Sequence, residues 1–144
     1  MADDDPDDRE LAREAMVASR LRNPLYFVGD GEELLDFLHR RGKYAEGIAP
    51  RPGLILLDLN MPRMDGREAL RAIKADPALR TIPTIVLTTS NADEDVLACY
   101  SLGANSFITK PVTFDRLVEV MGALGAYWFN TVDLPADSTT AHRT

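Results

Sequence analysis

Three residues that can handle a phosphoryl group follow three separate apolar segments of the sequence. Asp58 comes directly after residues 54–57, Thr88 ends a second apolar run, and Lys110 comes directly after residues 106–109. A carboxylate can attack phosphorus and form an acyl phosphate. An ammonium and a hydroxyl group bind the oxygens of a phosphoryl group. This set of residue types therefore indicates phosphoryl transfer to an aspartate.

The beginning of the sequence is strongly acidic. The first ten residues hold six acidic residues and one arginine, a net charge of −5, whereas the whole chain has −7. Like charges at this density repel each other, so the segment is either a solvated tail or a site for a cation. Two or three carboxylates with a loop carbonyl form the all-oxygen site that Mg²⁺ prefers.

Helical and extended patterns alternate along the chain. Apolar spacing, N-caps and breakers predict helices over residues 6–20, 32–41, 66–75, 92–103 and 113–130, and strands over 25–28, 54–57, 84–88 and 106–109. Such alternation predicts a doubly wound parallel sheet with helices on both faces. Ligands of these sheets bind at the carboxyl ends of the strands. Asp58, Thr88 and Lys110 are all expected at that edge, with the N-terminal acids as a fourth contributor.

Each of these features also has an ordinary explanation when it is taken alone. Asp58 and Lys110 could be turn residues, the acids could be a frayed tail, and Ser90 or Asn91 after Thr88 could cap a helix. Their common position at one edge of the sheet favours the functional interpretation.

Composition excludes several classes of protein. The 144 residues fit one domain, expected over 1–130, with a polar tail over 131–144 that is too short for an output domain. The acidic balance argues against nucleic-acid binding, and no apolar run is long enough for a membrane span. The single cysteine, Cys99, excludes an internal disulfide. We expect a cytoplasmic protein.

The residues around the predicted site resemble a known family. Residues 54–66 (LILLDLNMPRMDG), the pair Leu87-Thr88 and the segment FITKP at 107–111 are similar to the receiver domain of two-component response regulators. The stretches GDGEELLDFLHRRGKYA, LTTS and SFITKPVTF resemble single-domain regulators that partner bacterial phytochrome histidine kinases. The resemblance covers residues 3–130 and implies the flavodoxin-like (CheY-like) fold of five βα units.

The resemblance also implies a role for individual residues. Asp58 would accept the phosphoryl group from a kinase histidine. Asp3 and Asp4 would be an acidic pair that holds Mg²⁺, with Asp4, Asp58 and the backbone carbonyl of Asn60 as direct ligands and Asp3 acting mostly through water.

The remaining implied roles concern binding and switching. Thr88 and Lys110 would each bind a phosphoryl oxygen, and Phe107 would turn inward when Thr88 moves toward the phosphate. A plain core role for Phe107 stays open, because aromatic residues are common in strands. The resemblance also implies a cis bond between Lys110 and Pro111.

One departure from the family concerns the first strand. The family begins with a buried apolar strand that ends at the acidic pair, but here only Met1 and Ala2 precede Asp3. The strand is expected to be missing or reduced to a stub, which would leave two inner edges unpaired and the acidic pair unanchored. Either the sequence starts late, or a truncated regulator completes its sheet with a partner chain.

The segment 113–130 is apolar over more than half of its circumference. It carries nine apolar side chains: Phe114, Leu117, Val118, Val120, Met121, Leu124, Tyr127, Trp128 and Phe129. A homodimer built on this helix and neighbouring elements is the favoured explanation. The alternative is that the C-terminal tail covers the helix.

Three function classes compete. The first is a phosphorylation-switched receiver that is not an enzyme beyond assisting its own phosphorylation and dephosphorylation, and that signals by a surface change or phosphate relay. The second, a phosphatase of the haloacid-dehalogenase type, needs an acid two residues after the nucleophile, where this chain has Asn60. The third is a pseudo-receiver that binds a partner without phosphorylation.

Overall fold

The centre of the computed structural model, which describes residues 1–47 and 49–135, is a parallel β-sheet. Its strands are β1 (Ile55–Leu57), β2 (Thr84–Thr88) and β3 (Ser106–Thr109), in the order β1-β2-β3. Leu57 pairs with Val86, and Val86 pairs with Phe107. All three strands lie where the sequence predicted them.

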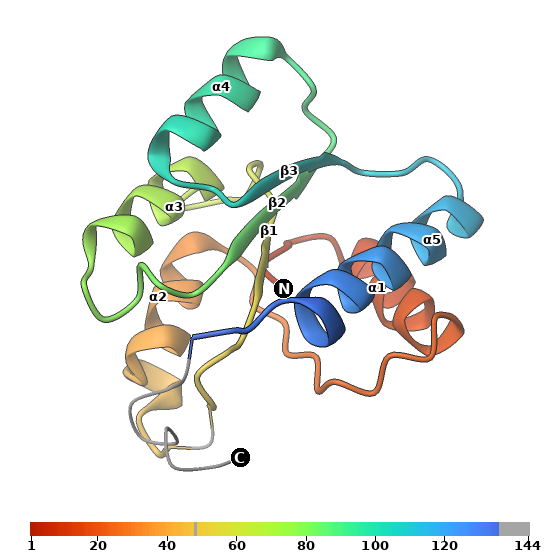
Figure 1. The fold of residues 1–144 in the computed structure, drawn as a ribbon. Coiled ribbons are helices and arrows are strands. Elements are labelled where there is room, and N and C mark those ends of the chain that lie inside the picture. The colour runs from red at the N-terminus through yellow and green to blue at the C-terminus, as the bar shows by residue number, and fades with distance from the viewer. Residues whose placement is uncertain (48, 136–144) are drawn as a thin grey trace.

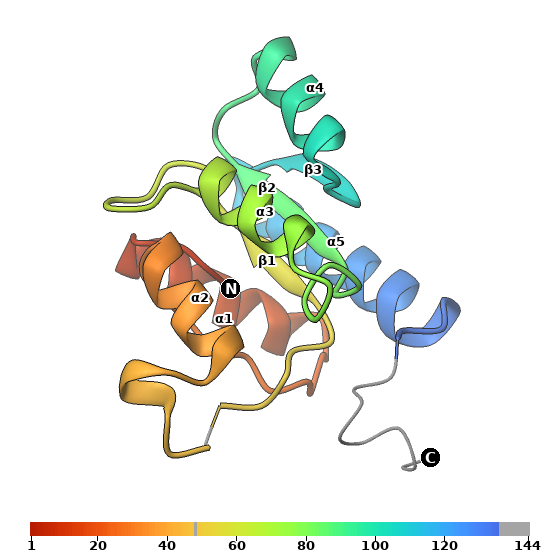
Figure 2. The same ribbon diagram turned by 90° about the vertical axis from the view of Figure 1, so that its left-hand side faces the viewer.

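Helices cover both faces of this sheet. They are α1 (Pro6–Ala18), α2 (Gly31–His39), α3 (Gly66–Ala75), α4 (Asp93–Leu102) and α5 (Phe114–Gly125), with a 3₁₀ turn η1 (Gly42–Tyr44) and a π-helical turn η2 (Ala126–Thr131) after α5. Figures 1 and 2 show α1 and α5 on one side of the sheet and α2 and α3 on the other. Helix α4 lies beside α3 and the edge strand β3. The predicted doubly wound α/β fold is confirmed.

The two central strands are buried on both faces. Leu56 and Ile85 pack in the cluster formed with α1 and α5, whereas Leu57 and Val86 pack in the cluster formed with α2 and α3. Every residue of β1 and β2 is buried. This explains why their sequences are continuously apolar rather than alternating.

Side-chain caps fix the starts of α1, α2, α3 and α5. Asp5 caps α1 by accepting from the Asp7 N–H, and Asp65 forms a capping box with Glu68 at α3. Helix α4 has Ala92 as its N-cap and no side-chain cap, so the alternative explanation, in which Ser90 or Asn91 caps this helix, is wrong. The hydroxyl of Ser90 instead donates to the side chain of Asp95.

The truncated first strand is present as a short stub, which we define as residues Met1–Asp3. Ala2 forms isolated parallel bridges to Val28 on one side and to Leu57 on the other. The Ala2 N–H donates to the Leu56 carbonyl (2.8 Å), and the Asp3 N–H donates to the Val28 carbonyl (3.0 Å). The stub therefore lies between residues 25–28 and β1, in the place predicted for the first strand.

Two expectations about this part of the sheet are wrong. The predicted strand over 25–28 is reduced to the bridge at Val28, because the stub offers it only a short partner and Pro24 has no N–H to donate. Asp3 is not on an unanchored end. It is fully buried, and its backbone is hydrogen-bonded to Val28.

None of the helices in the described residues is both long and apolar enough to cross a membrane. Of the tail expected over 131–144, residues 136–144 lie outside the described part of the chain.

Candidate functional site

Asp58 is held at the carboxyl end of β1 by the backbone on both sides of it. The Asp58 N–H donates to the Ala2 carbonyl (3.0 Å). The loop that follows Asp58 is closed by the Gly66 N–H, which donates to the Leu59 carbonyl (2.9 Å). The Asp58 side chain is buried, and its Oδ1 accepts from the Asn60 N–H (3.2 Å). The carboxylate is therefore fixed at the edge where ligands of parallel sheets bind.

Lys110 reaches the same place from the end of β3. Its Nζ donates to Asp3 (2.7 Å), Asp8 (2.8 Å) and Asp58 (3.0 Å). Its backbone N–H donates to the Thr88 carbonyl (2.7 Å), which ties the end of β3 to the end of β2. Residues far apart in the sequence thus meet in one cluster of charges.

Thr88 is the last residue of β2 and is fully buried. The register pairs Leu57 with Val86 and Thr88 with Thr109, so Asp58 directly follows the end of β1 and Thr88 lies at the end of β2. The Ser90 N–H lies 3.5 Å from the Thr88 hydroxyl oxygen. The structure therefore places Asp58, Thr88 and Lys110 at one edge of the sheet.

Three carboxylates of this edge are close enough to hold one metal ion. An oxygen of each of Asp3, Asp4 and Asp58 lies within 4.8 Å of the others, with Asp3 and Asp58 buried and Asp4 exposed. An all-oxygen donor set with one exposed side fits a hard divalent cation that keeps some of its waters. Asn60, two residues after Asp58, is exposed at the same turn.

Sequence reasoning missed Asp8 as a member of the cluster. Asp8 lies in the first turn of α1, where an acidic residue interacts favourably with the helix dipole. The sequence feature that could have identified Asp8 is its position one helical turn after the Asp5 cap. This position places its side chain over the same edge of the sheet as Asp3. The structure gives it a hydrogen bond to Lys110.

Burial and the charges within the cluster together shift the pKa values of Asp3 and Lys110. Burial raises the pKa of Asp3 above its usual value, although the hydrogen bond from Lys110 opposes this shift. Burial alone would lower the pKa of Lys110, but its hydrogen bonds to Asp3, Asp8 and Asp58 raise it above the usual value. With four ionised aspartates and one lysine, the cluster would carry an excess of negative charge that a divalent cation would balance.

Phe107 and the residues beyond it differ in part from expectation. Phe107 is partly buried against the core cluster of α2 and α3, and its N–H donates to the Tyr100 hydroxyl (3.2 Å). The described residues contain no cis peptide bond, so the expected cis bond between Lys110 and Pro111 is wrong. The trans form is the lower in energy for most bonds before proline.

A parallel sheet with acidic, hydroxyl and ammonium groups at one edge is the architecture of a receiver. Residues 1–121 match the model of the response regulator receiver domain, and the chain belongs to this family. The chain is 40% identical to the response regulator Rcp1 of Synechocystis sp. over 136 residues, which cover 94% of this chain and 91% of the relative.

Solved structures agree with this assignment. The phosphorylated cyanobacterial phytochrome response regulator RcpA has a TM-score of 0.86 and 39% identity, covering 94% of this chain and 95% of that one. The Mn²⁺-bound form of Rcp1 has a TM-score of 0.85 and 40% identity, covering 94% and 96%. The chain is thus a receiver homologous to phytochrome response regulators.

Proposed function

We propose that this protein is a two-component response regulator that is phosphorylated on Asp58 and acts as a switch. The contact that carries the proposal is the 3.0 Å hydrogen bond between Lys110 Nζ and the Asp58 carboxylate, at the edge formed by the carboxyl ends of the strands. An ammonium in that position can bind an oxygen of the incoming phosphoryl group. The phosphoryl group is transferred from a donor histidine to an Asp58 oxygen, and the bond between phosphorus and the histidine nitrogen breaks.

Mg²⁺ is the proposed cofactor of this reaction. Asp3, Asp4, Asp58 and the Asn60 carbonyl would hold it, and it would neutralise charge on the phosphoryl oxygens. The cluster of three carboxylates supports this assignment. The Mn²⁺-bound form of the relative Rcp1 supports a divalent ion at such a site.

Thr88 and Phe107 are the proposed switch. When Asp58 is phosphorylated, the Thr88 hydroxyl would bind a phosphoryl oxygen, and Phe107 would turn further into the core that it already contacts. Phe107 is only partly buried and lies in β3, the strand that pairs with β2, so a movement of Thr88 can reach it through the paired strands. The altered surface around β3 is the output.

The proposed partner is a sensor histidine kinase in the cytoplasm, of the bacteriophytochrome type. The relative RcpA is a phytochrome response regulator, which supports a phytochrome kinase as the donor. In this proposal residues 1–130 form the receiver, residues 131–144 form a tail, and the protein acts on another protein rather than on a small substrate.

Incubation with acetyl phosphate, with and without Mg²⁺, tests the proposal by intact mass. The wild type should gain the mass of one phosphoryl group only with the metal, and Asp58→Asn should gain none. Asp115→Asn, an exposed acid in the first turn of α5, is the matched control and should be labelled like the wild type. If the wild type is never labelled, the pseudo-receiver becomes the better explanation.

We further propose a homodimer built on α5 and its neighbours. A hollow of about 330 Å³ between β3 and α5 is lined by Ile108, Val120, Leu124 and Trp128 among others. Exposed Tyr127 on η2 also lines this hollow, and exposed Leu97 and Tyr100 lie on α4, which contacts β3. Light scattering at tens of micromolar should give twice the chain mass, and Trp128→Glu should give a monomer.

A further inference from the structure

The loop that follows β1 carries the backbone carbonyl of Asn60, a proposed ligand of Mg²⁺. Its first residues alternate between buried and exposed positions. Leu59 and Met61 are buried in the cluster formed with α2 and α3, whereas Asn60 between them is exposed. Burial of the two neighbours therefore decides that Asn60 faces outward. The second half of the loop needs a separate anchor, because residues 62–63 are exposed.

Arg63 supplies this anchor by reaching Asp30, the N-cap residue of α2. The Arg63 Nε donates to Asp30 Oδ2 (3.0 Å), and the terminal nitrogen Nη2 donates to the same oxygen. The Asp30 side chain is only 2% exposed, and its Oδ1 accepts from the Glu33 N–H (2.8 Å). Both oxygens of a buried carboxylate are thus used, one on its own helix and the other on the loop.

The backbone makes a second contact between the loop and α2. The Gly31 N–H donates to the Met64 carbonyl (2.8 Å), and a Cβ atom at Gly31 would lie 2.5 Å from that oxygen. The loop therefore approaches the start of α2 more closely than a residue with a side chain permits. On the other side, the Gly29 N–H donates to Glu33 Oε1 (2.7 Å), which fixes the residues before α2 to the helix.

Arg63 adopts a backbone conformation that an arginine does not favour. Its φ angle is +60°, in the left-handed region that glycine and asparagine adopt more readily. This conformation costs free energy for most residues with a Cβ atom, so the surrounding contacts must hold it. The paired hydrogen bonds to the buried Asp30 are such contacts, whereas the exposed Glu32 lies 3.8 Å from the Arg63 Nε.

We propose that Asp30 and Arg63 are positioning residues for the metal site, because their ion pair holds the loop that presents the Asn60 carbonyl. The pair acts through the backbone between Arg63 and Asn60 and not by binding the metal ion itself. Groups that orient metal ligands in this way typically change metal affinity by about 10–100-fold when they are removed. This inference rests on the proposed function, since it gives the loop a task only if Mg²⁺ binds beside Asp58.

Calorimetric titration of the unphosphorylated protein with Mg²⁺ tests this inference. Arg63→Met should bind Mg²⁺ about tenfold more weakly than the wild type, because the loop loses its tie to α2. Asp30→Ser should show the same loss, since serine still caps the helix but has no second oxygen for Arg63. The double variant should lose no more than either single variant, because both substitutions remove one contact. Unchanged Mg²⁺ affinity in both single variants, or additive losses in the double variant, overturns the inference.

Two further variants separate the ion pair from other effects of these substitutions. Glu32→Gln removes an exposed acid near Arg63 and is the matched control, which should bind Mg²⁺ like the wild type. Arg63→Asn relieves the cost of the positive φ angle, but its side chain ends several atoms short of the guanidinium. This variant should be more stable than Arg63→Met in urea and should bind Mg²⁺ equally weakly. Wild-type affinity in Arg63→Asn would show that only the backbone conformation matters and would overturn the inference.

Labelling by acetyl phosphate distinguishes this inference from the proposed function. At saturating Mg²⁺, Arg63→Met should be labelled at about the wild-type rate, whereas at low Mg²⁺ its labelling should be about tenfold slower. Slow labelling at every Mg²⁺ concentration would show a general defect of the variant and would overturn the inference alone. If the wild type neither binds Mg²⁺ nor is labelled, the proposed function fails, and the inference fails with it.

Discussion

The ammonium of Lys110 lies 2.7 Å from the carboxylate of Asp3, although the two residues are separated by almost the whole described chain. Asp3 is fully buried, and the same ammonium also contacts Asp8 and Asp58. Without a metal ion, Lys110 is therefore the cation that compensates the buried acids. Its removal and the addition of Mg²⁺ should have opposite effects on stability.

Lys110→Met should destabilise the metal-free protein by about 3 kcal/mol, because it leaves buried carboxylates without a counter-charge. Added Mg²⁺ should restore much of this loss, since the ion would replace the missing positive charge. Urea denaturation with and without Mg²⁺ measures both effects. The control is Lys43→Met, which removes an exposed lysine paired with Glu33 and should not change the response to Mg²⁺. A Lys110→Met variant as stable as the wild type without metal would contradict this account.

Asp3→Asn and Asp4→Asn should each lower the affinity for Mg²⁺ by about tenfold or more, because each would remove one carboxylate charge from the proposed metal site. Affinity in the wild type should also fall as the pH is lowered, since burial raises the pKa of Asp3 and protons compete earlier for it. Isothermal titration calorimetry at several pH values measures both effects. Asp7→Asn, an exposed acid outside the metal cluster, should bind like the wild type.

Gly66→Ala should disturb the turn that holds Asp58. A Cβ atom at this position would lie 2.1 Å from the Asp58 carbonyl oxygen and 2.7 Å from the Leu59 Cα, and both atoms belong to the backbone. We expect a loss of about 1–3 kcal/mol in unfolding free energy and slower labelling by acetyl phosphate. Thermal melts and intact mass would measure these changes.

Gly122→Ala is the matched control for that substitution. Its Cβ would meet only the Ser19 Cβ at 3.7 Å, an ordinary contact between α5 and the C-terminal end of α1. This change should stabilise the protein by about 0.5–1 kcal/mol, because alanine is the better helix former. If both alanine variants behave alike, the close approach at Gly66 does not matter for the site.

Glu33 should make the unfolding free energy of the protein depend on pH. Burial alone would raise its pKa, but hydrogen bonds from Lys43, Tyr44 and the Gly29 N–H lower the pKa to about 2. Because the pKa is lower in the folded protein, this stabilisation is present above pH 4.5 and is lost as the pH falls toward about 2. Glu33→Gln should therefore be less stable than the wild type at pH 7, and the difference should shrink below pH 4.5.

Urea denaturation at pH 7 and at pH 3 measures this effect. The control is Glu32→Gln at the neighbouring exposed position, whose nearest cation is 3.8 Å away. This variant should show a much smaller difference at both pH values. A Glu33→Gln penalty that is equal at pH 7 and at pH 3 would point to a packing effect instead.

The strand sequences predicted the main parts of this fold because burial on both faces leaves a clear pattern. The continuous apolar runs that become β1 and β2 placed Asp58 and Thr88 correctly at the ends of strands. The turn before Pro111 did the same for Lys110. These positions depend only on where strands end, which a sequence encodes locally.

Features that depend on partners distant in the sequence were harder to predict. Residues 25–28 look like a strand, but strand formation needs a full neighbour, and the stub supplies only Ala2 for the bridge to Val28. Asp8 is one of several acids near the start of the sequence, and its contact with Lys110 appears only when α1 and the end of β3 are brought together. Local pattern cannot contain such information.

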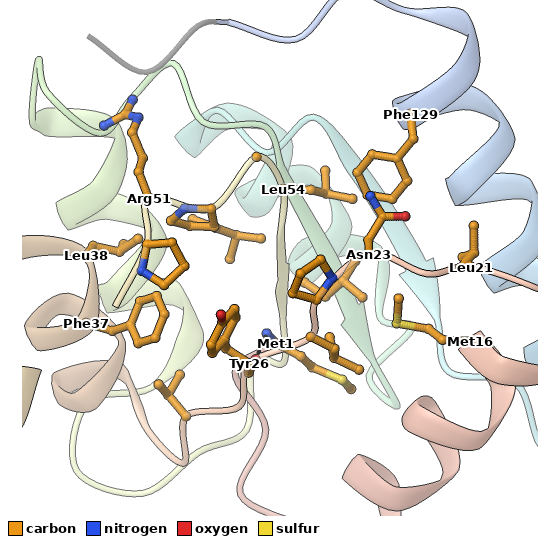
Figure 3. Close-up of a pocket in the computed structure, with 18 of the residues that line it drawn as sticks. Met1, Met16, Leu21, Asn23, Tyr26, Phe37, Leu38, Arg51, Leu54 and Phe129 are labelled. Carbon is orange, nitrogen blue, oxygen red and sulfur yellow. Dashed lines mark hydrogen bonds between the residues drawn. The ribbon is translucent and has the colours of Figure 1, made fainter. Parts of the chain in front are cut away.

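The position of Met1 has a practical consequence for producing the protein. Its carbonyl accepts from Val28, and the following residue holds the Asp58 backbone, so the first residues are built into the interior. A polar affinity tag attached there would have to leave through the apolar space beside Tyr26 (Figure 3), next to the backbone that holds Asp58. Preparations with and without such a tag should not be compared as though they were the same molecule.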